Sequence, residues 1–322
     1  MESYGGPFTM EKIVIALGGN ALQEGKGPAT AEAQLKVVEK TSEYIAGIIQ
    51  AGYSVALAHG NGPQVGRIVI QNEHADALTP AMPFDVCGAM SQGMIGYHIQ
   101  QALRRALEAR GIAKDVVSLV TQVVVSADDP AFENPEKPIG PFYSLDEARR
   151  MEQDKGYVMK EDSGRGWRRV VASPNPTRIV ELAAVKTLMD SGFVVVTVGG
   201  GGIPVIEQED GTLKGAAAVI DKDLASERLG EDIGADILLI LTAVEKVCIR
   251  FGKPDETALS RITAAEAMMY MEEGHFAPGS MKPKIEAAVR FARSRPGRTA
   301  IITSLDKAAE ALKGLAGTAI AQ

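Results

Sequence analysis

Five short runs rich in Val, Ile and Leu, each leading into glycine or small polar residues, constrain the fold of this chain most strongly. Runs of this length that are apolar throughout are typical of strands buried on both faces. The runs lie at residues 13–20, 55–62, 194–202, 237–246 and 299–305, and segments with helical periodicity separate them at 31–49, 90–108, 177–190, 264–273 and 281–293. The alternation predicts an α/β fold, with a mainly parallel sheet and helices on both faces.

Glycine-rich loops are expected to meet at one edge of this sheet. Right-handed crossovers bring the carboxyl ends of parallel strands together, so residues 18–19, 60–62 and 199–202 should lie at the same edge. Backbone N–H groups at such turns bind phosphates. For any single loop, it is equally plausible that the glycine is there only because the turn between strand and helix requires it. Four consecutive glycines, however, carry an entropic cost that turn geometry alone does not readily explain, and this favours phosphate binding.

Several classes of protein are disfavoured by composition and by the spacing of motifs. The formal net charge of −7 provides no overall attraction for nucleic acid or an anionic membrane. Two distant cysteines and four scattered histidines predict no disulfide framework and no metal site. His59 could reach the glycine edge of the sheet, but without a partner at a suitable spacing it is expected to support the backbone rather than to act in catalysis. The sequence contains no P-loop motif, and its glycines do not have the spacing of a dinucleotide-binding motif. A P-loop protein and a nicotinamide-dependent enzyme are therefore not expected.

The first residues show no signal-peptide pattern, and no apolar run approaches the roughly 18 residues of a membrane span. Together with the sparse cysteines, these features predict a cytoplasmic protein.

One long segment, residues 126–176, departs from the strand–helix pattern. It is polar, rich in Pro and Gly, and contains several aromatic residues. Long connections of this kind are commonly lids or small subdomains. Within it, Lys137 lies between prolines, which would present a single cation rigidly. On its own, the stretch would be only a proline-rich loop.

Two predicted helices begin with lysines, at the end where the helix dipole disfavours a cation. Lys222 lies between Asp221 and Asp223, and Lys282 and Lys284 follow Ser280, a predicted cap. A capping Asp221 with an exposed lysine is the alternative interpretation. Lysines that converge without histidine or cysteine chemistry fit phosphoryl transfer, in which the protein neutralises charge on the moving group. A carboxylate between Lys222 and Lys284 would reduce their repulsion.

At this point the sequence resembles the carbamate kinases of the amino acid kinase superfamily, from about residue 12 to the C-terminus. The resembling stretches are VIALGGNAL (14–22), AHGNGPQVG (58–66), DPAFENPEKPIGPFY (129–143), VVTVGGGGIPV (195–205), AVIDKDLAS (218–226), LTAVEKVCIRFGKP (241–254) and FAPGSMKPK (276–284). The resemblance implies reversible phosphoryl transfer between ATP and carbamate, giving ADP and carbamoyl phosphate, with Mg²⁺. It also implies an open three-layer αβα sandwich, a small protruding lid subdomain and a homodimer.

The resemblance also assigns roles to individual residues. Lys137 matches the lysine of the protruding subdomain, Lys222 and Lys284 match two core lysines, and Asp223 matches the aspartate that organises them. The loops around the carbamoyl group and the transferred phosphate are matched by Gly18, Gly19, Asn20, Gly60, Asn61, Gly200 and Gly201. The nucleotide side is matched by Thr242, Ala243, Val244, Phe251, Gly252, Lys253, Pro254, Gly279, Ser280 and Met281. No protein ligands for a metal are predicted.

The implied organisation is an amino acid kinase domain over residues 12–322, with the carbamate and phosphoryl side in 12–230 and the nucleotide side in 231–322. Residues 126–176 form the inserted subdomain, and residues 1–11 are an extension that matches nothing.

The sequence departs from the family pattern at several positions. Ala16 and Leu17 stand where superfamily kinases of amino-acid carboxylates carry a lysine, so Lys222 would take over its task. Glu136 replaces an expected small hydroxyl residue, and Lys282 replaces an expected apolar one. Two other functions remain open: a different acid or phosphate kinase of this superfamily, and a non-catalytic nucleotide or metabolite sensor on the same fold.

Overall fold

An eight-stranded sheet forms the centre of the protein. The computed structural model describes residues 10–23, 28–162 and 164–322. All neighbouring strands in the sheet run parallel except β16 and β17. From edge to edge the strands are β15 (Arg261–Thr263), β17 (Thr318–Ala321), β16 (Thr299–Ser304), β12 (Ile237–Thr242), β1 (Lys12–Leu17), β2 (Ser54–His59), β9 (Val194–Val196) and β3 (Val116–Ser118). The predicted mainly parallel sheet is confirmed.

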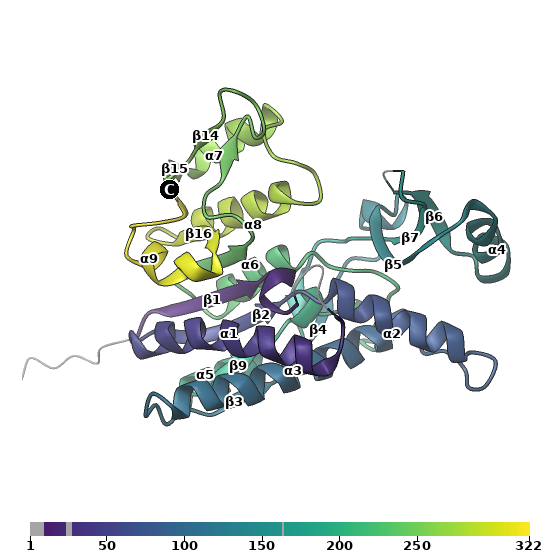
Figure 1. Cartoon of the computed structure of the whole chain (residues 1–322), viewed down its shortest axis with the longest axis horizontal. Coiled ribbons are helices and arrows are strands. Elements are labelled where there is room, and N and C mark those ends of the chain that lie inside the picture. The colour runs from purple at the N-terminus through teal and green to yellow at the C-terminus, as the bar shows by residue number, and fades with distance from the viewer. Residues whose placement is uncertain (1–9, 24–27, 163) are drawn as a thin grey trace, which may run out of the picture.

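Helices cover both faces of this sheet (Figure 1). Side chains along β1 alternate between two apolar cores: Val14 and Ala16 face one, and Ile13, Ile15 and Leu17 face the other. One core is closed by α5 (Leu182–Asp190), α6 (Lys222–Asp232) and α8 (Met281–Ser294), and the other by α1 (Ala31–Gln50), α3 (Phe84–Glu108) and α9 (Ala308–Leu312). Burial on both sides explains why the strands are apolar without alternation.

A second sheet and several short elements complete the main body. The second sheet has four strands in the order β11 (Leu213–Gly215), β10 (Ile203–Glu207), β4 (Gln122–Val124) and β8 (Arg178–Ile179). The shorter elements are a hairpin of β13 (Cys248–Ile249) and β14 (Thr257–Ala258), helix α7 (Ala264–Glu272), and the 3₁₀ turns η1 (Gly19–Ala21), η2 (Pro130–Phe132), η3 (Gly199–Gly201) and η4 (Leu305–Lys307).

Three helices differ from their sequence predictions, and the first of them, α3, begins at Phe84 rather than at residue 90. The helix predicted from residue 177 begins at Leu182, because β8 pairs with β4 ahead of it. Helix α2 (Gly62–Ala75) begins inside a stretch that was interpreted as a glycine loop. Pro63 lies in its first turn, where proline costs a helix no hydrogen bond.

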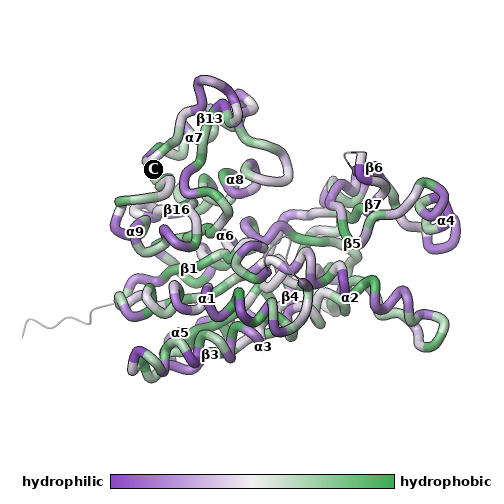
Figure 2. Tube along the Cα trace, viewed as in Figure 1, coloured by the Kyte–Doolittle hydropathy of each residue, from purple (hydrophilic) through white to green (hydrophobic). Residues whose placement is uncertain are grey.

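A small three-stranded sheet stands out from the main body, at the right of Figure 1. It consists of β5 (Lys137–Tyr143), β7 (Trp167–Val171) and β6 (Val158–Glu161), with helix α4 (Leu145–Lys155) at its tip. A capping box between Ser144 and Glu147 starts α4, which is mostly hydrophilic in Figure 2. We call residues 137–171 the protruding subdomain. A protruding subdomain is confirmed as part of the fold, and its sheet and helix occupy the central part of the segment predicted at 126–176.

The base of the protruding subdomain rests on α2. Ile139 and Val171 share an apolar cluster with Ile68 and Val69 of that helix. Further along α2, the carboxylate of Glu73 accepts hydrogen bonds from the hydroxyls of two tyrosines of the subdomain. These contacts fix where β5 begins relative to the main body.

The two halves expected at residues 12–230 and 231–322 share one sheet, because β12 pairs directly with β1. Of the N-terminal extension, residues 1–9 lie outside the described part of the chain. Among the residues described, no helix is long and apolar enough to cross a membrane.

Candidate phosphoryl-transfer site

Helix α6 begins with three charged residues that have different tasks. Asp221 is the N-cap, and its Oδ1 accepts a hydrogen bond from the backbone N–H of Asp223 at 2.9 Å. The ammonium of Lys222 donates to Asp223 Oδ1. The alternative interpretation is therefore right about the capping by Asp221 and wrong about Lys222, whose side chain is only 13% exposed. An ion pair with the next residue compensates for its unfavourable place in the helix dipole.

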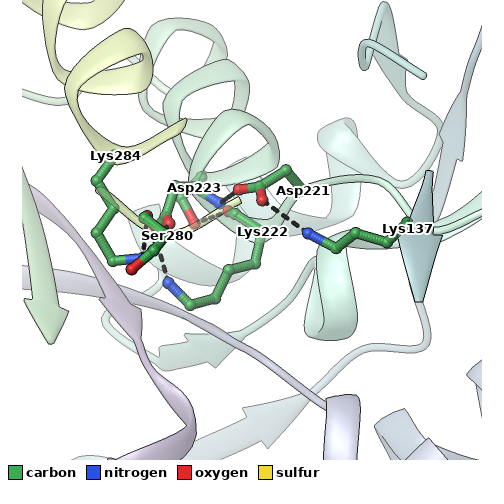
Figure 3. A network of polar contacts seen from close by, with 7 residues as sticks. Lys137, Asp221, Lys222, Asp223, Ser280 and Lys284 are labelled. Carbon is green, nitrogen blue, oxygen red and sulfur yellow. Dashed lines mark hydrogen bonds and ion pairs between the residues drawn. The ribbon is translucent and has the colours of Figure 1, made fainter. Parts of the chain in front are cut away.

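Asp223 also binds a lysine from a distant helix (Figure 3). Lys284, in the first turn of α8, donates from Nζ to Asp223 Oδ2 at 3.1 Å across a separation of 61 residues. Asp223 is 2% exposed. Burial would raise the pKa of its carboxyl, but the two ammonium groups outweigh this effect and hold the pKa below its ordinary value. The carboxylate is therefore ionised near neutral pH, and it holds the two lysines together.

Lys137 reaches the same helix start from the protruding subdomain. Its Nζ lies 3.1 Å from Oδ2 of Asp221, a residue 84 positions later in the chain. In Figure 3 Lys137 extends from β5 toward Asp221, whereas Lys222 and Lys284 meet at Asp223. The four residues predicted as catalytic thus lie around the N-terminus of α6, with three lysines facing two aspartates.

A cavity of about 240 Å³ lies beside the two core lysines. Lys222 and Lys284 both line it, together with the end of β12 and the segments that directly follow β1, β12 and β16. The other residues of the wall are Gly18, Gly19, Asn20, Ala21, Leu241, Thr242, Ala243 and Leu305. The cavity therefore combines the first predicted glycine loop with two ammonium groups at the carboxyl edge of the sheet.

Gly18 is required where β1 and β12 end side by side. Its N–H donates to the carbonyl of Leu241 at 3.1 Å, and a Cβ at this position would approach the same oxygen to 2.8 Å. Gly60 lies against the stem of Lys222, because a Cβ there would come within 3.5 Å of Lys222 Cδ. A side chain at this position would therefore only touch the lysine stem, so the contact does not by itself require glycine.

The glycines at 199–202 have a sufficient structural cause, which corrects the argument made from the sequence. Gly200, Gly201 and Gly202 all have positive φ. A Cβ on any of the four would collide with a neighbour, such as Asn61 beside Gly200 or the Ile220 carbonyl beside Gly201. Packing and backbone conformation thus explain four consecutive glycines without a bound phosphate.

The remaining glycine-loop residues that were predicted to bind phosphate lie outside the smaller cavity. Among the described residues, the wall of the 240 Å³ cavity does not include Gly60, Asn61, Gly200 or Gly201. The side-chain amide of Asn61 donates to the hydroxyl of Ser91 at 2.8 Å. The structure gives these residues no direct place on the cavity wall.

His59 is a buried supporting residue, as expected. Burial lowers its pKa to about 4, and a hydrogen bond to the carbonyl of Gly60 opposes this only in part. Its Nδ1 lies 2.9 Å from that carbonyl oxygen, and its Nε2 fills the space that a side chain at Gly199 would need. A neutral ring in this position links two glycine loops.

A larger cavity of about 820 Å³ lies on the C-terminal half of the chain. It adjoins the smaller one along the chain, since Ala243 lines the smaller cavity and Val244 the larger. Five residues predicted for the nucleotide side line it: Val244, Phe251, Lys253, Ser280 and Met281. Thr242 and Ala243 line the smaller cavity, whereas Gly252, Pro254 and Gly279 are not among the lining residues of either.

The larger cavity also contains residues that the sequence interpretation did not select. They are Glu245, Lys246, Cys248, Arg250, Glu256, Ala258, Gly274, His275, Phe276 and Ala277. Several lie within the stretches at 241–254 and 276–284 that carried the resemblance, so these stretches contained the signal. The hairpin of β13 and β14, which brings them to one wall, has strands of only two residues each and leaves little periodicity to detect.

Ser280 corrects a detail of the prediction. It occupies the N-cap position of α8, but its hydroxyl makes no capping hydrogen bond, because its backbone is not extended (φ −127°, ψ −88°). Its carbonyl instead receives a hydrogen bond from Lys284 Nζ at 3.3 Å. Lys282, in the same turn, is exposed. Only one of the two lysines that follow Ser280 therefore enters the site.

The remaining departures from the family pattern lie away from the lysine contacts. Ala16 and Leu17 are fully buried in the two apolar cores, and Lys222 supplies the ammonium group beside the end of β1. Glu136 is exposed and accepts a hydrogen bond from Asn134 at 3.0 Å.

Comparisons with known proteins agree with this geometry. The profile of the amino acid kinase family matches residues 11–304. A carbamate kinase of Clostridium perfringens is 54% identical over 312 residues, which cover 96% of this chain and 99% of the relative. The chain belongs to the carbamate kinases of the amino acid kinase family. It is also 56% identical to a carbamate kinase-like protein of Escherichia coli, over 97% of this chain and 99% of that protein.

A solved carbamate kinase has the same fold. The enzyme from Giardia lamblia, bound to AMP-PNP, superimposes with a TM-score of 0.92 at 46% identity, covering 97% of this chain and 98% of that one. The match confirms the predicted amino acid kinase fold. Family membership makes this chain a kinase, while the tasks of its individual lysines remain predictions.

Proposed function

We propose that the protein transfers a phosphoryl group reversibly between ATP and carbamate, giving ADP and carbamoyl phosphate. The observation that carries this proposal is the pair of core lysines, joined by one buried carboxylate and lining a cavity at the glycine edge of the sheet. The larger cavity next to it is the proposed nucleotide site. The solved relative with bound AMP-PNP supports a nucleotide on this fold.

In the ATP-forming direction, an oxygen of the β-phosphate of ADP would attack the phosphorus of carbamoyl phosphate. The bond from phosphorus to the carbamate oxygen would break, and carbamate would leave without a covalent enzyme intermediate. Lys222 and Lys284 would neutralise the oxygens of the moving group, and Lys137 would approach from the protruding subdomain. An ammonium about 4 Å from such an oxygen is worth on the order of 4 kcal/mol at an effective dielectric constant near 20.

Mg²⁺ is part of the proposal as a companion of the nucleotide. Among the described residues, no group of three or more His, Cys, Asp or Glu side chains could hold a metal ion. Asp221 and Asp223 are both paired with lysines. These residues fit an ion carried mainly by phosphate oxygens and water, which is common for Mg²⁺ in kinases. When bound, the ion would neutralise part of the phosphate charge.

A coupled assay tests the reaction. Carbamoyl phosphate and ADP with Mg²⁺ should yield ATP, detected through hexokinase and glucose-6-phosphate dehydrogenase, whereas acetylglutamate with ATP should yield no ADP above background. Turnover with acetylglutamate alone would replace carbamate as the substrate. Calorimetric binding of ATP without turnover of either substrate would indicate a sensor instead.

We also propose a homodimer formed through α3. Val86, Met90, Gly93 and Tyr97 follow one another at spacings of four, three and four residues, so they lie on one face of the helix, and all four are exposed. Tyr97 is 58% exposed. An apolar stripe with a glycine near its centre suits close packing against the same stripe of a second copy.

Light scattering after size exclusion tests the dimer. Wild type should have twice the mass of the chain, and Tyr97→Arg should shift it to a monomer. Leu315→Arg is the control, because Leu315 is equally apolar and 75% exposed but lies outside the stripe. A monomeric wild type would contradict the proposal.

Finally, we propose a cytoplasmic location. Both cysteines are free thiols, Cys87 buried and Cys248 partly so, and this is typical of a reducing compartment. We retain the division into a carbamate side, residues 12–230, and a nucleotide side, residues 231–322. The positions of the two cavities support this division, and Lys284 is the residue of the second half that reaches the phosphoryl site.

A further inference from the structure

Asp221 occupies a place that the catalytic scheme above does not use. Its two carboxylate oxygens have separate partners: Oδ1 accepts from the backbone N–H of Asp223, and Oδ2 accepts from Lys137. One side chain therefore contacts both the helix that carries the core lysines and the lysine of the protruding subdomain (Figure 3). The side chain of Asp221 is 15% exposed and that of Lys137 is 32% exposed, so the ion pair is partly shielded from water.

The charges of the network show why this aspartate matters. Three ammonium groups, of Lys137, Lys222 and Lys284, lie near two carboxylates, of Asp221 and Asp223. Asp223 is fully engaged with the two core lysines. Without Asp221, Lys137 would face two cations balanced by a single anion, and like-charge repulsion would drive its flexible side chain toward solvent.

The backbone around Lys137 does not fix its ammonium group by itself. Lys137 is the first residue of β5, paired with Val171 of β7, and Ile139 anchors the strand on α2. These contacts hold the Cα of Lys137, but four rotatable bonds separate that atom from Nζ. Among the described residues, Asp221 is the one that forms an ion pair with Lys137.

We propose that Asp221 is a positioning residue for phosphoryl transfer: it holds the Lys137 ammonium over the N-terminus of α6 until the phosphoryl group arrives and takes over as its partner. This inference rests on the proposed function, because Lys137 is the group that Asp221 positions. The capping bond ties the position of the carboxylate to that of Lys222 and Asp223. The positions of Lys137 and of the two core lysines are thereby all fixed relative to the N-terminus of α6.

The variant Asp221→Asn separates positioning from capping. Asparagine caps helices as well as aspartate does, but it lacks the charge that holds the ammonium. We expect kcat to fall about 10- to 100-fold, the size of one lost positioning contact, with the KM for ADP changed less than about twofold. Asp221→Ser, which also caps, should behave in the same way. Asp129→Asn is the matched control, because Asp129 also caps a helical turn through its side chain but lies outside this network.

A double-mutant cycle tests whether Asp221 acts through Lys137. In a Lys137→Ala background, Asp221→Asn should change kcat less than about twofold, because the group to be positioned is gone. A merely structural aspartate would impose the same loss in both backgrounds. That multiplicative result would overturn the proposal, and so would a wild-type kcat for Asp221→Asn. A tenfold or larger rise in the KM for Mg-ADP with unchanged kcat would also overturn it, since it would place Asp221 at the nucleotide.

A second readout does not depend on catalysis. Competitive labelling with acetic anhydride, read by mass spectrometry, should modify Lys137 at least about threefold faster in Asp221→Asn than in wild type, because the ion pair no longer shields the amine. The exposed Lys313 provides the internal reference. Unchanged labelling would contradict the positioning contact. A wild type inactive in the ATP-forming assay, but with the expected labelling, would instead refute the proposed reaction and leave the contact in place.

Discussion

Replacing Lys137 with alanine is expected to lower kcat about 10³-fold, the scale on which a charge-supplying side chain acts in other phosphoryl transferases. Lys137 reaches the start of α6 from the protruding subdomain and contacts Asp221 there. It does not line the proposed nucleotide cavity, so the KM for ADP should change little. The coupled ATP-forming assay gives both constants.

Lys160→Ala is the matched control for this variant. Lys160 lies in the same subdomain, on β6, and its ammonium donates to Asn134 at the surface. Its loss should leave kcat within about twofold of wild type, as expected for an exposed contact. A Lys137→Ala enzyme with near wild-type turnover would remove the protruding subdomain from the chemistry and leave only the two core lysines.

Asp223→Asn is expected to damage both activity and stability. The substitution leaves Lys222 and Lys284, whose side chains are only 13% and 17% exposed, without their shared anion. Breaking a buried ion pair from one side typically costs about 3 kcal/mol or more. Two lysines that repel each other would also lose their common position, so we expect kcat to fall at least about 100-fold. Denaturant unfolding at pH 7 measures the first effect and the coupled assay the second.

The difference in the free energy of unfolding between wild type and Asp223→Asn should depend on pH in a defined direction. The pKa of Asp223 is lower in the folded protein than in the unfolded chain. Its contribution to the free energy of unfolding is therefore fully present above the unfolded pKa of about 4, and it is lost as the pH falls through the folded value. The stability gap between wild type and Asp223→Asn should be constant near neutrality and close in acid.

Asp190→Asn provides the control for stability. It removes an ion pair with Lys12 at 3.2 Å in which the aspartate side chain is 66% exposed, and such pairs contribute about 1 kcal/mol at most. An Asp223→Asn protein as stable as this control would show that the two lysines do not depend on a buried anion.

The elements that could be predicted from sequence are those with strong local signals. The central strands are apolar along most of their length because helices cover both faces, and the runs at 13–20 and 237–246, which contain most of β1 and all of β12, were recognised for that reason. The lysines of α6 and α8 were recognisable because they lie at the wrong end of the helix dipole. Helix α2 was missed, since a Gly-Pro start has the composition of a loop.

The glycines illustrate where such signals mislead. The four at 199–202 suggested phosphate binding, but positive φ angles and the crowding by Asn61, His59 and Ile220 account for them. Whether a glycine serves a ligand or a neighbouring side chain depends on what packs against it, and that neighbour is distant in sequence. The interpretation of Ser280 as a side-chain cap was also wrong, because the residue does not have the extended backbone that a capping serine needs.

The sequence alone determined the class of this protein: strands that end in small residues, an inserted polar segment, and lysines at two helix starts, with enough matching stretches to indicate the family. Only the tertiary structure decided the pairing of charges. Lys284 meets Asp223 across 61 residues and Lys137 meets Asp221 across 84. Local propensities act over a few residues, whereas an ion pair depends on where the sheet and the protruding subdomain place two side chains. Which aspartate serves which lysine is therefore decided by packing.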